Sequence, residues 1–300
     1  METRPRTMEW KPASTVILVR EKSKALQVYL LKRSSASSFF PGWYVFPGGA
    51  VDAEDHVGGP WESNADLTGR ELLKKFGPDL DMDDALAYCV SAIRETFEEA
   101  GIFLGYAKDQ SQAHLEELCR LRLRTGLSKG WFWQWVVSQQ WVLSFSRLSR
   151  WARWITPELM HKHFDTRFFV AVVPAGQSCM PDNRETTLGM WTGVKEALTA
   201  NLRGTLPLSP PTLVTLHELL NFRGLKDLQT ALATRPWGET RFPRLVPLSR
   251  GAVVLQSWDP MRNEAVNISP EGLKKAVLPV GAPFSRMWLD KGTWKPVSVQ

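Results

Sequence analysis

Hydrophobic positions with helical spacing define one strong element of the chain. Between residues 83 and 101, apolar side chains recur every three or four positions, at Leu86, Val90, Ile93 and Phe97. This spacing is typical of a helix that buries one face. Asp83 or Asp84 can cap its start, and Gly101 can adopt the left-handed conformation that ends it. We therefore expect an amphipathic helix over these residues.

Other patterns predict strands and shorter helices around this helix. Two β-rich runs, 13–20 and 26–33, are joined by a charged turn and predict a hairpin. The run 168–173 is apolar throughout, which is typical of a strand buried on both faces. We expect further strands at 43–46 and near 187–191, and helices at 70–76, 114–124, 193–198, 212–221 and 225–233. Such elements predict an α/β fold, a mixed sheet between helices in an α/β/α sandwich.

Tryptophan is concentrated in one segment. Residues 131–154 hold six of the 14 tryptophans, and the 16 residues from 131 to 146 contain no Asp, Glu, Lys or Arg. The run is too short, and too interrupted by glutamine, for a membrane span. Flanking Lys129 and Arg147 leave a peripheral membrane contact open. We favour helices from about 107 to 163 that cap the core, with a homodimer contact as the other alternative.

Composition and loops divide the chain into three parts. These are a polar lead-in (1–12), a main domain (13–235) and a proline-rich, strand-like extension (236–300). Glycine and proline residues mark an insertion in the main domain at about 56–82, and loops accept such length at a small cost in free energy. The extension contains no catalytic motif, so we expect a small β-rich unit folded against the main domain.

Charge and cysteine content narrow the class of protein. Hydrophobic residues make up 43% and charged residues 23% of the 300 positions, as in an ordinary folded globular protein. The net charge of +6 suits a polyanionic small substrate, nucleic acid or an anionic membrane. Because no RNA-binding module is recognisable, we do not expect a nucleic-acid partner. The three cysteines are far apart and form no Cys-x-x-Cys pair, which argues against a disulfide framework and against a zinc site.

The two ends of the sequence bear on the cellular compartment that we expect for the protein. The first ten residues contain no apolar segment like that of a secretory signal. The last three residues are not a peroxisomal tripeptide of the Ser-Lys-Leu type. Together with the unpaired cysteines, these features lead us to expect a cytoplasmic protein.

Three carboxylates share one face at the end of the predicted helix. Glu95, Glu98 and Glu99 are related as i, i+3 and i+4, so their side chains emerge together. Like charges repel, the helix dipole disfavours them at this end, and only Arg94 adjoins them. Hard divalent cations prefer such oxygens. The pattern therefore indicates Mg²⁺ or Mn²⁺, against the alternative of a solvated charged face.

Two positions before this helix are candidates for contact with a ligand. Arg33 ends the second predicted strand, where it is either the counter-ion of a phosphate or a solvated surface charge. In Pro47-Gly48-Gly49 the two glycines let the backbone approach a ligand closely, although the tripeptide alone is also an ordinary turn.

The segment Arg94–Ile102 matches R-E-U-x-E-E-x-G-U, where U is a bulky aliphatic residue, with threonine at the first U position. This is the second half of the signature of the Nudix hydrolases, and the first half is present at Phe46–Asp52. In the family pattern an acidic residue follows a glycine by six positions, and here Asp55 follows Gly49. The arginine then lies 39 residues further on, so this loop is about 31 residues longer than in the family pattern. The chain thus resembles a Nudix hydrolase with an insertion in its signature.

A signature split in this way resembles the coenzyme A diphosphatase branch of that family. The likeness covers roughly residues 13–235 and includes Glu185, six positions before Trp191, and short stretches at 31–33, 40–42, 164–169 and 206–222. It implies a Nudix-type α/β/α sandwich with a mixed sheet, a helical insertion and a C-terminal extension.

The resemblance also implies roles for individual residues. It implies that Mg²⁺ or Mn²⁺ is held by Glu95, Glu98, Glu99 and the carbonyl group of Gly48. The metal would activate water for attack on a diphosphate, and a base must take the proton of that water. The candidates for this base are Glu95, Glu98 and Glu185. Arg94 would complete the catalytic set by holding a carboxylate in position.

Substrate binding is assigned to three residues near the signature. We expect Arg33 and Gly49 to lie against the substrate, and Asp55 to contact it through water unless it is simply a solvated loop acid. The resulting activity is metal-dependent hydrolysis of a diphosphate, with coenzyme A or an acyl-coenzyme A as the favoured substrate. ADP-ribose, NADH or a dinucleoside polyphosphate are alternatives, and so is a nucleotide-binding protein without activity.

Overall fold

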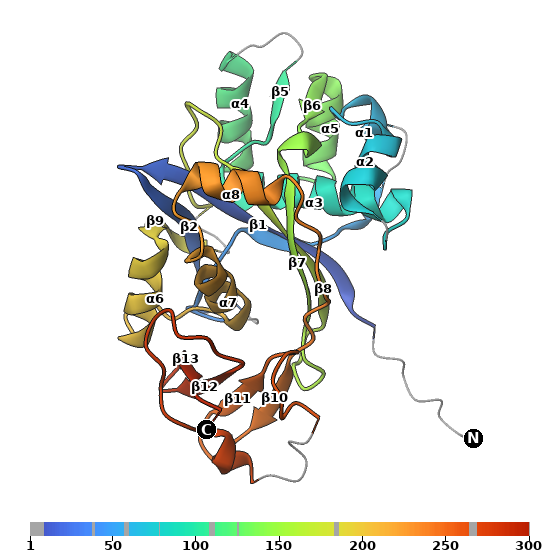
Figure 1. Cartoon of the computed structure of the whole chain (residues 1–300). Helices are drawn as coiled ribbons and strands as arrows, with labels where there is room; N and C mark the ends of the chain where they lie inside the picture. The colour runs from blue at the N-terminus through green and yellow to red at the C-terminus, as the bar shows by residue number, and fades with distance from the viewer. Residues whose placement is uncertain are drawn as a thin grey trace, which may run out of the picture.

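A mixed β-sheet organises the protein, whose computed structural model describes residues 9–37, 40–56, 60–77, 79–107, 112–124, 126–182, 186–263 and 269–299 (Figure 1). Within these ranges seven strands form the sheet: β1 (Lys11–Lys22), β2 (Ala25–Arg33), β3 (Tyr44–Val45), β4 (Gly48–Ala50), β7 (Ser149–Ile155), β8 (Phe164–Val172) and β9 (Thr186–Gly193).

Strand β1 lies at the centre of this sheet. The order is β3-β2-β1-β8-β7, with β4 paired to the start of β1 and β9 paired to β2. β1 and β8 run parallel, from the pair Lys11 and Phe164 to the pair Val19 and Val172, and the other neighbours are antiparallel. The predicted hairpin is confirmed as β1 and β2, and the parallel pair makes the sheet mixed, as expected.

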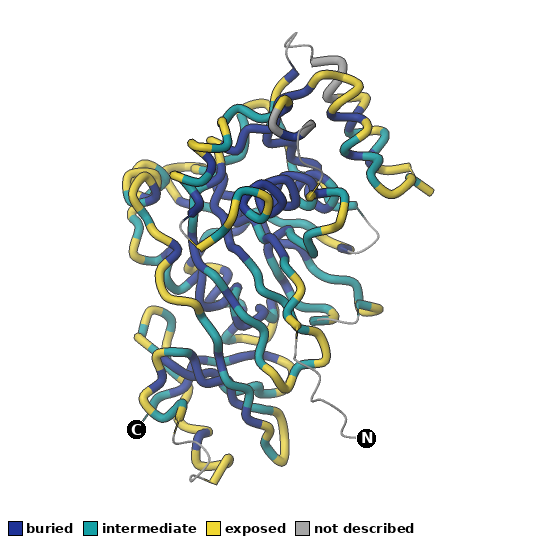
Figure 2. The backbone as a smooth tube through the Cα atoms, turned by 90° about the vertical axis from the view of Figure 1, so that its right-hand side faces the viewer, coloured by how far each residue is buried: buried dark blue, intermediate teal, exposed yellow. Residues whose placement is uncertain are grey.

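Helices cover both faces of the sheet. Alternate side chains of β1 point to opposite faces, so Val16 and Leu18 contact one core cluster while Ile17 and Val19 contact the other. The first cluster contains the inner faces of α2 (Gly69–Phe76), α3 (Met82–Ala100) and α5 (Trp131–Ser138). The second contains those of α6 (Val194–Leu202), α7 (Pro210–Leu219) and α8 (Leu225–Leu232). This arrangement confirms the α/β/α sandwich, with the buried backbone in the middle of the molecule (Figure 2).

The long helix α3 agrees with the sequence pattern except at its start. Its predicted apolar stripe is buried, and Gly101 has φ of 70° and donates its N–H to the carbonyl of Phe97, which confirms the predicted end. The prediction that Asp83 or Asp84 caps the start was wrong. Asp81 is the N-cap, and its carboxylate accepts the backbone N–H of Asp84 at 2.8 Å. The helix therefore begins earlier, at Met82.

The segment from 107 to 163 is less helical than predicted. The helices α4 (Gln112–Arg122) and α5 are present, but α5 is followed by a strand of a small two-stranded sheet and then by β7, the edge strand of the main sheet. The expectation of cap helices was therefore wrong from residue 141 onward. Figure 1 places α1 (Pro60–Ser63), β5 (Gly105–Ala107), α4, α5 and β6 (Trp141–Leu143) together at one end of the molecule. The inserted segments also contain the short helices η1 (Ala53–His56) and η2 (Phe145–Arg147). In the described residues, no helix combines the length and apolar character needed to cross a bilayer.

The C-terminal part forms a sheet of its own at the opposite end of the molecule (Figure 1). In the residues described there, the strands are β10 (Arg244–Pro247), β11 (Ala252–Leu255), β12 (Arg286–Asp290) and β13 (Thr293–Val297), with η3 (Pro270–Leu273) between β11 and β12. Val254, Met287 and Trp294 pack into the same core cluster as α6 and α7. The sheet is thus attached to the sandwich by a shared apolar core.

A buried ion pair lies within this C-terminal part. Arg286 donates from Nε and Nη2 to the two carboxylate oxygens of Asp259, both at 2.9 Å, and Ser285 donates to the same carboxylate at 2.7 Å. Neither charged side chain is exposed to solvent. Removal of one partner would leave a buried charge without compensation.

We expect Asp259→Ala to lower the free energy of unfolding by about 3–5 kcal/mol, because it leaves the guanidinium of Arg286 buried and unpaired. The matched control is Asp290→Ala, which removes the partner of Lys295 in the same sheet, where both side chains are partly exposed. That change should cost less than about 1 kcal/mol. Denaturant unfolding measures both, and equal costs would contradict the prediction.

Candidate active site

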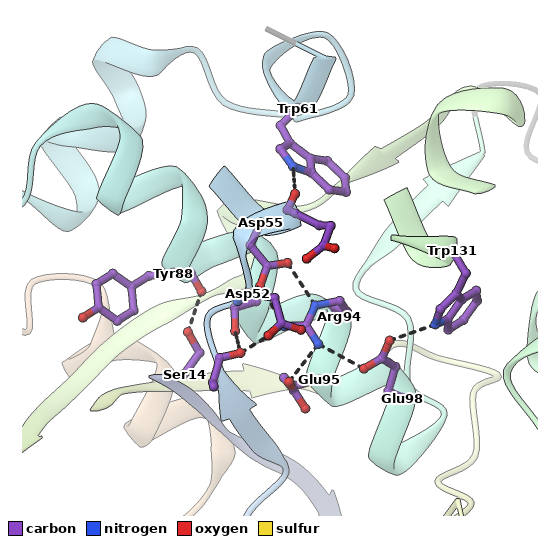
Figure 3. Close-up of polar contacts among 12 residues, drawn as sticks. Ser14, Asp52, Asp55, Trp61, Tyr88, Arg94, Glu95, Glu98 and Trp131 are labelled. Atoms are coloured by element: carbon purple, nitrogen blue, oxygen red, sulfur yellow. Dashed lines mark hydrogen bonds and ion pairs between the residues drawn. The ribbon is translucent and has the colours of Figure 1, made fainter. Parts of the chain in front are cut away.

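Arg94 lies at the centre of a polar cluster where the second half of α3 faces β4 (Figure 3). Its Nε and Nη2 donate to the two carboxylate oxygens of Asp55, at 2.9 and 2.7 Å. Its Nη1 donates to Glu95 at 2.8 Å and to Glu98 at 3.1 Å. Nη2 also donates to the carbonyl of Ala50 at 3.0 Å. One guanidinium therefore orients three carboxylates and the end of β4.

Asp55 is a buried partner of Arg94. Its side chain is 1% exposed, and one oxygen also accepts the backbone N–H of Asp52 at 2.9 Å. The alternative that Asp55 is a solvated loop acid was therefore wrong, and its contact with the substrate stays a prediction. The acidic residue six positions after Gly49 nevertheless meets Arg94, although 39 residues separate the two in sequence.

The glycines before the helix lie against its carboxylates. The backbone N–H of Gly48 donates to Glu99 at 2.8 Å. A β-carbon on Gly49 would lie 2.5 Å from the carboxyl carbon of Glu95, so any larger residue would displace that side chain. Gly49 is required here for its close approach to Glu95, while the expected approach to a ligand stays a prediction. The structure thus brings together Gly48, Gly49 and the three predicted glutamates.

The cluster holds several carboxyl groups around a single guanidinium, that of Arg94. Burial raises the pKa of Glu95 to about 8, against the opposing effect of Arg94. Burial also raises the pKa of Glu98. Burial lowers the pKa of Arg94, but its bonds to Asp55 and the nearby glutamates outweigh that effect and raise it overall. Arg94 is consequently a permanent cation that only partly neutralises its neighbours.

The carboxylate groups of the cluster are chemically suited to bind a divalent cation. Glu95, Glu98 and Glu99 supply the hard oxygen ligands that Mg²⁺ and Mn²⁺ prefer. Within the described residues, no three His, Cys, Asp or Glu side chains already converge as a metal site. Glu95 and Glu98 turn toward Arg94, and Glu99 turns toward Gly48. An ionised carboxylate has about four lone-pair sites, so these hydrogen bonds leave room for a cation on the same side chains.

Two residues from the inserted region hold Glu98, and sequence reasoning missed both. The indole N–H of Trp131 donates to Glu98 Oε1 at 3.1 Å. Arg122 donates from Nη1 to the backbone carbonyl of Glu98 at 2.7 Å and from Nη2 to the carbonyl of Met180 at 3.0 Å. The dense run of tryptophans indicated that this segment packs near the core, but no motif indicated the contact with Glu98.

The two remaining predicted residues lie apart from this cluster or outside the description. Arg33 donates from Nε and Nη2 to the hydroxyl of Ser37, both at 3.1 Å, and lines a cavity that also reaches Gly48 and Gly49. Glu185, the third candidate base, falls outside the described residues.

Comparison with known proteins agrees with this geometry. Residues 74–219 match the family model described as the NUDT19 Nudix domain. The acyl-coenzyme A diphosphatase NUDT19 of Xenopus laevis is 28% identical over 244 residues, which cover 70% of this chain and 63% of that protein. The human protein of the same name is 26% identical over 272 residues, covering 75% of this chain and 72% of that protein. A crystal structure of a NUDIX hydrolase from Alicyclobacillus acidocaldarius superposes with a TM-score of 0.58 at 24% identity, covering 77% of this chain and 99% of that one.

The chain is therefore similar to the Nudix hydrolases, with a signature loop that is longer than in their pattern. Within that family it resembles the acyl-coenzyme A diphosphatases, and it spans about 63% of the length of the frog relative.

We expect Asp55→Ala to lower the free energy of unfolding by about 3 kcal/mol, because Arg94 loses its buried two-bonded partner. Asp52→Ala is the control for stability, since the Asp52 side chain is 60% exposed and lies 3.6 Å from Arg94. It should cost less than about 1 kcal/mol. Denaturant unfolding measures the difference. A raised KM for Asp55→Ala at unchanged stability would instead indicate that this residue binds substrate.

Trp131→Phe tests the contact from the insertion. The change keeps an aromatic ring but removes the N–H donor to Glu98, so we expect kcat to fall about tenfold, the size expected for one hydrogen bond to a charged group. Trp133→Phe is the matched control on the same helix, because that indole packs on Trp61 with ring centroids 4.7 Å apart. Steady-state kinetics on both variants measures the effect. Equal losses in the two variants would show that only packing matters.

Proposed function

We propose that this protein is a metal-dependent diphosphatase that hydrolyses coenzyme A or an acyl-coenzyme A. The observation that carries the proposal is the cluster of Glu95, Glu98 and Glu99 on one face of α3 beside the glycines of β4. The names of the frog and human relatives, acyl-coenzyme A diphosphatases, support the choice of substrate.

A divalent cation would be held by the three glutamates together with the carbonyl of Gly48. Nudix hydrolases generally use such metals, and we propose Mg²⁺ or Mn²⁺ because carboxylate and carbonyl oxygens suit both. When bound, the cation neutralises diphosphate oxygens and lowers the pKa of the attacking water. The excess of carboxylates around Arg94 supports this assignment.

The chain itself supplies positioning and a proton acceptor. Arg94 keeps Glu95 and Glu98 on the same side of α3, and Trp131 fixes the second oxygen of Glu98. The side chain of Glu98 is 29% exposed and that of Glu95 is 15% exposed, so Glu98 is the more accessible to a water molecule. We propose that a carboxylate oxygen of Glu98 accepts the proton of the attacking water.

A basic group near the same backbone supports binding of the phosphate groups. Arg33 lies on the cavity that Gly48 and Gly49 also line. A guanidinium can pair with two phosphate oxygens at once. We propose that Arg33 orients the diphosphate against the glycine-rich strand.

Glu98→Gln tests the proposed reaction. We expect kcat to fall on the order of 10²–10⁴-fold, since the amide cannot accept the proton, while the melting temperature changes little. Glu117→Gln is the control, because Glu117 is exposed on α4. Product release is measured from coenzyme A, palmitoyl-coenzyme A, ADP-ribose, NADH and diadenosine polyphosphates, with Mg²⁺, with Mn²⁺ and with a chelator.

The products decide between the outcomes. Metal-dependent release of 4′-phosphopantetheine and adenosine 3′,5′-diphosphate from coenzyme A supports the proposal, and cleavage of another compound alone assigns a different substrate to the same chemistry. Full activity in Glu98→Gln would overturn the role of this carboxylate.

A further inference from the structure

A cavity of about 630 Å³ lies between the main sheet and the C-terminal sheet. This volume falls within the range of about 300–1,000 Å³ that small-molecule sites usually have. Its wall is mainly apolar, with large side chains from the main sheet and from the C-terminal sheet: Phe46, Trp154, Phe168, Leu245, Val254 and Trp294. A chamber of this size and lining suits an apolar ligand group.

One end of the cavity reaches the proposed catalytic residues. Gly48 and Gly49 line it, and the same two glycines contact the carboxylates of Glu99 and Glu95. Lining residues that the structure describes include no Asp or Glu, whereas Arg33, His161 and Lys162 lie on the wall. The chamber therefore suits a molecule that joins an anionic group to an apolar one.

Four hydroxyl groups of the wall are already bonded within the protein. The hydroxyls of Ser209 and Thr212 are 2.8 Å apart, and the Ser14 hydroxyl donates to the carbonyl of Tyr88 at 2.7 Å. The Thr156 hydroxyl accepts the backbone N–H of Phe164 at 3.1 Å. An acyl chain needs no hydrogen-bond partners, whereas an adenine ring would bury polar edge atoms that require them.

Strand alternation shows how the C-terminal sheet builds this wall. On β11, Ala252 and Val254 line the cavity, while Val253 and Leu255 pack in a separate core cluster with Val246 on β10. The extension without a catalytic motif therefore supplies one side of a chamber next to the catalytic residues.

We propose that this chamber binds the acyl chain of an acyl-coenzyme A substrate, so that the C-terminal sheet gives the protein a preference for long-chain substrates. The inference rests on the proposed hydrolysis of coenzyme A compounds. Each methylene group that becomes fully buried favours binding about fourfold. Over the length of a fatty acyl chain, even partial burial produces a measurable selectivity.

Ala252→Phe tests the chamber by filling it from the half-buried face of β11. The matched control is Ala276→Phe, the same substitution at an exposed position of the C-terminal part that does not line the cavity. kcat/KM is measured for coenzyme A, acetyl-coenzyme A and palmitoyl-coenzyme A. We expect Ala252→Phe to lower the value for palmitoyl-coenzyme A by at least about tenfold and to leave the others within about twofold, while Ala276→Phe changes none of them.

An equal fall in kcat/KM for all three substrates in Ala252→Phe would overturn the proposal, because it would place the nucleotide or pantetheine part in the chamber. No fall for any substrate would overturn it as well. If Ala252→Phe does not fold, Leu245→Gln makes the same test by placing an amide on the wall. An unchanged ratio of palmitoyl-coenzyme A to coenzyme A in that variant would equally overturn it.

Binding without turnover separates this proposal from the proposed function. Calorimetry in a chelator compares palmitoyl-coenzyme A with coenzyme A on wild type and Ala252→Phe. Tighter binding of the acyl compound to wild type, with a more negative heat-capacity change that Ala252→Phe removes, supports the chamber even if no coenzyme A compound is hydrolysed. Equal affinities for the two compounds would overturn the chamber, whether or not the protein cleaves coenzyme A.

Discussion

The guanidinium of Arg94 connects all parts of the proposed active site. It donates to the loop residue Asp55, to the last residue of β4 and to two carboxylates of α3. Without this cation the surrounding carboxylates would face one another with no positive charge between them, and their repulsion would separate the helix from the loop. Two hydroxyl contacts support the same junction, from Ser14 on β1 to Tyr88 and from Ser91 on α3 to Ala50. The same contacts therefore fix both the position of α3 on the sheet and the arrangement of the site.

The sequence predicted the elements whose determinants are local. The apolar stripe of α3 and its glycine end depend on residues within one helix, and the hairpin of β1 and β2 depends on adjacent runs. The cap of α3 was missed because Asp81, Asp83 and Asp84 all have suitable side chains, and the choice depends on where the chain leaves the preceding loop. Strand β7 was missed for a different reason. A register shift between Arg150 and Ala152 breaks the two-residue alternation that identifies a strand.

The candidate site was predictable to the extent that it follows helix spacing. The three glutamates and Arg94 lie on one face as their positions require. The pairing of Asp55 with Arg94 could not be derived from spacing, because the insertion leaves the two residues 39 positions apart in the sequence. Trp131 and Arg122 reach Glu98 only after α4 and α5 have folded over the end of α3. Contacts of this kind depend on how the insertions pack, and no short motif encodes that packing.

The buried pair of Asp55 and Arg94 also has a consequence for how such proteins can diversify. The pair defines a distance in space, and the chain between its members leaves and returns at the same two points whatever its length. The entropic cost of closing a loop rises by only about 0.6 kcal/mol for each doubling of its length. The loop between the two halves of the signature can therefore become longer while Asp55 and Arg94 keep their contact. Searches that require fixed spacing between the two halves of the signature would pass over proteins built in this way.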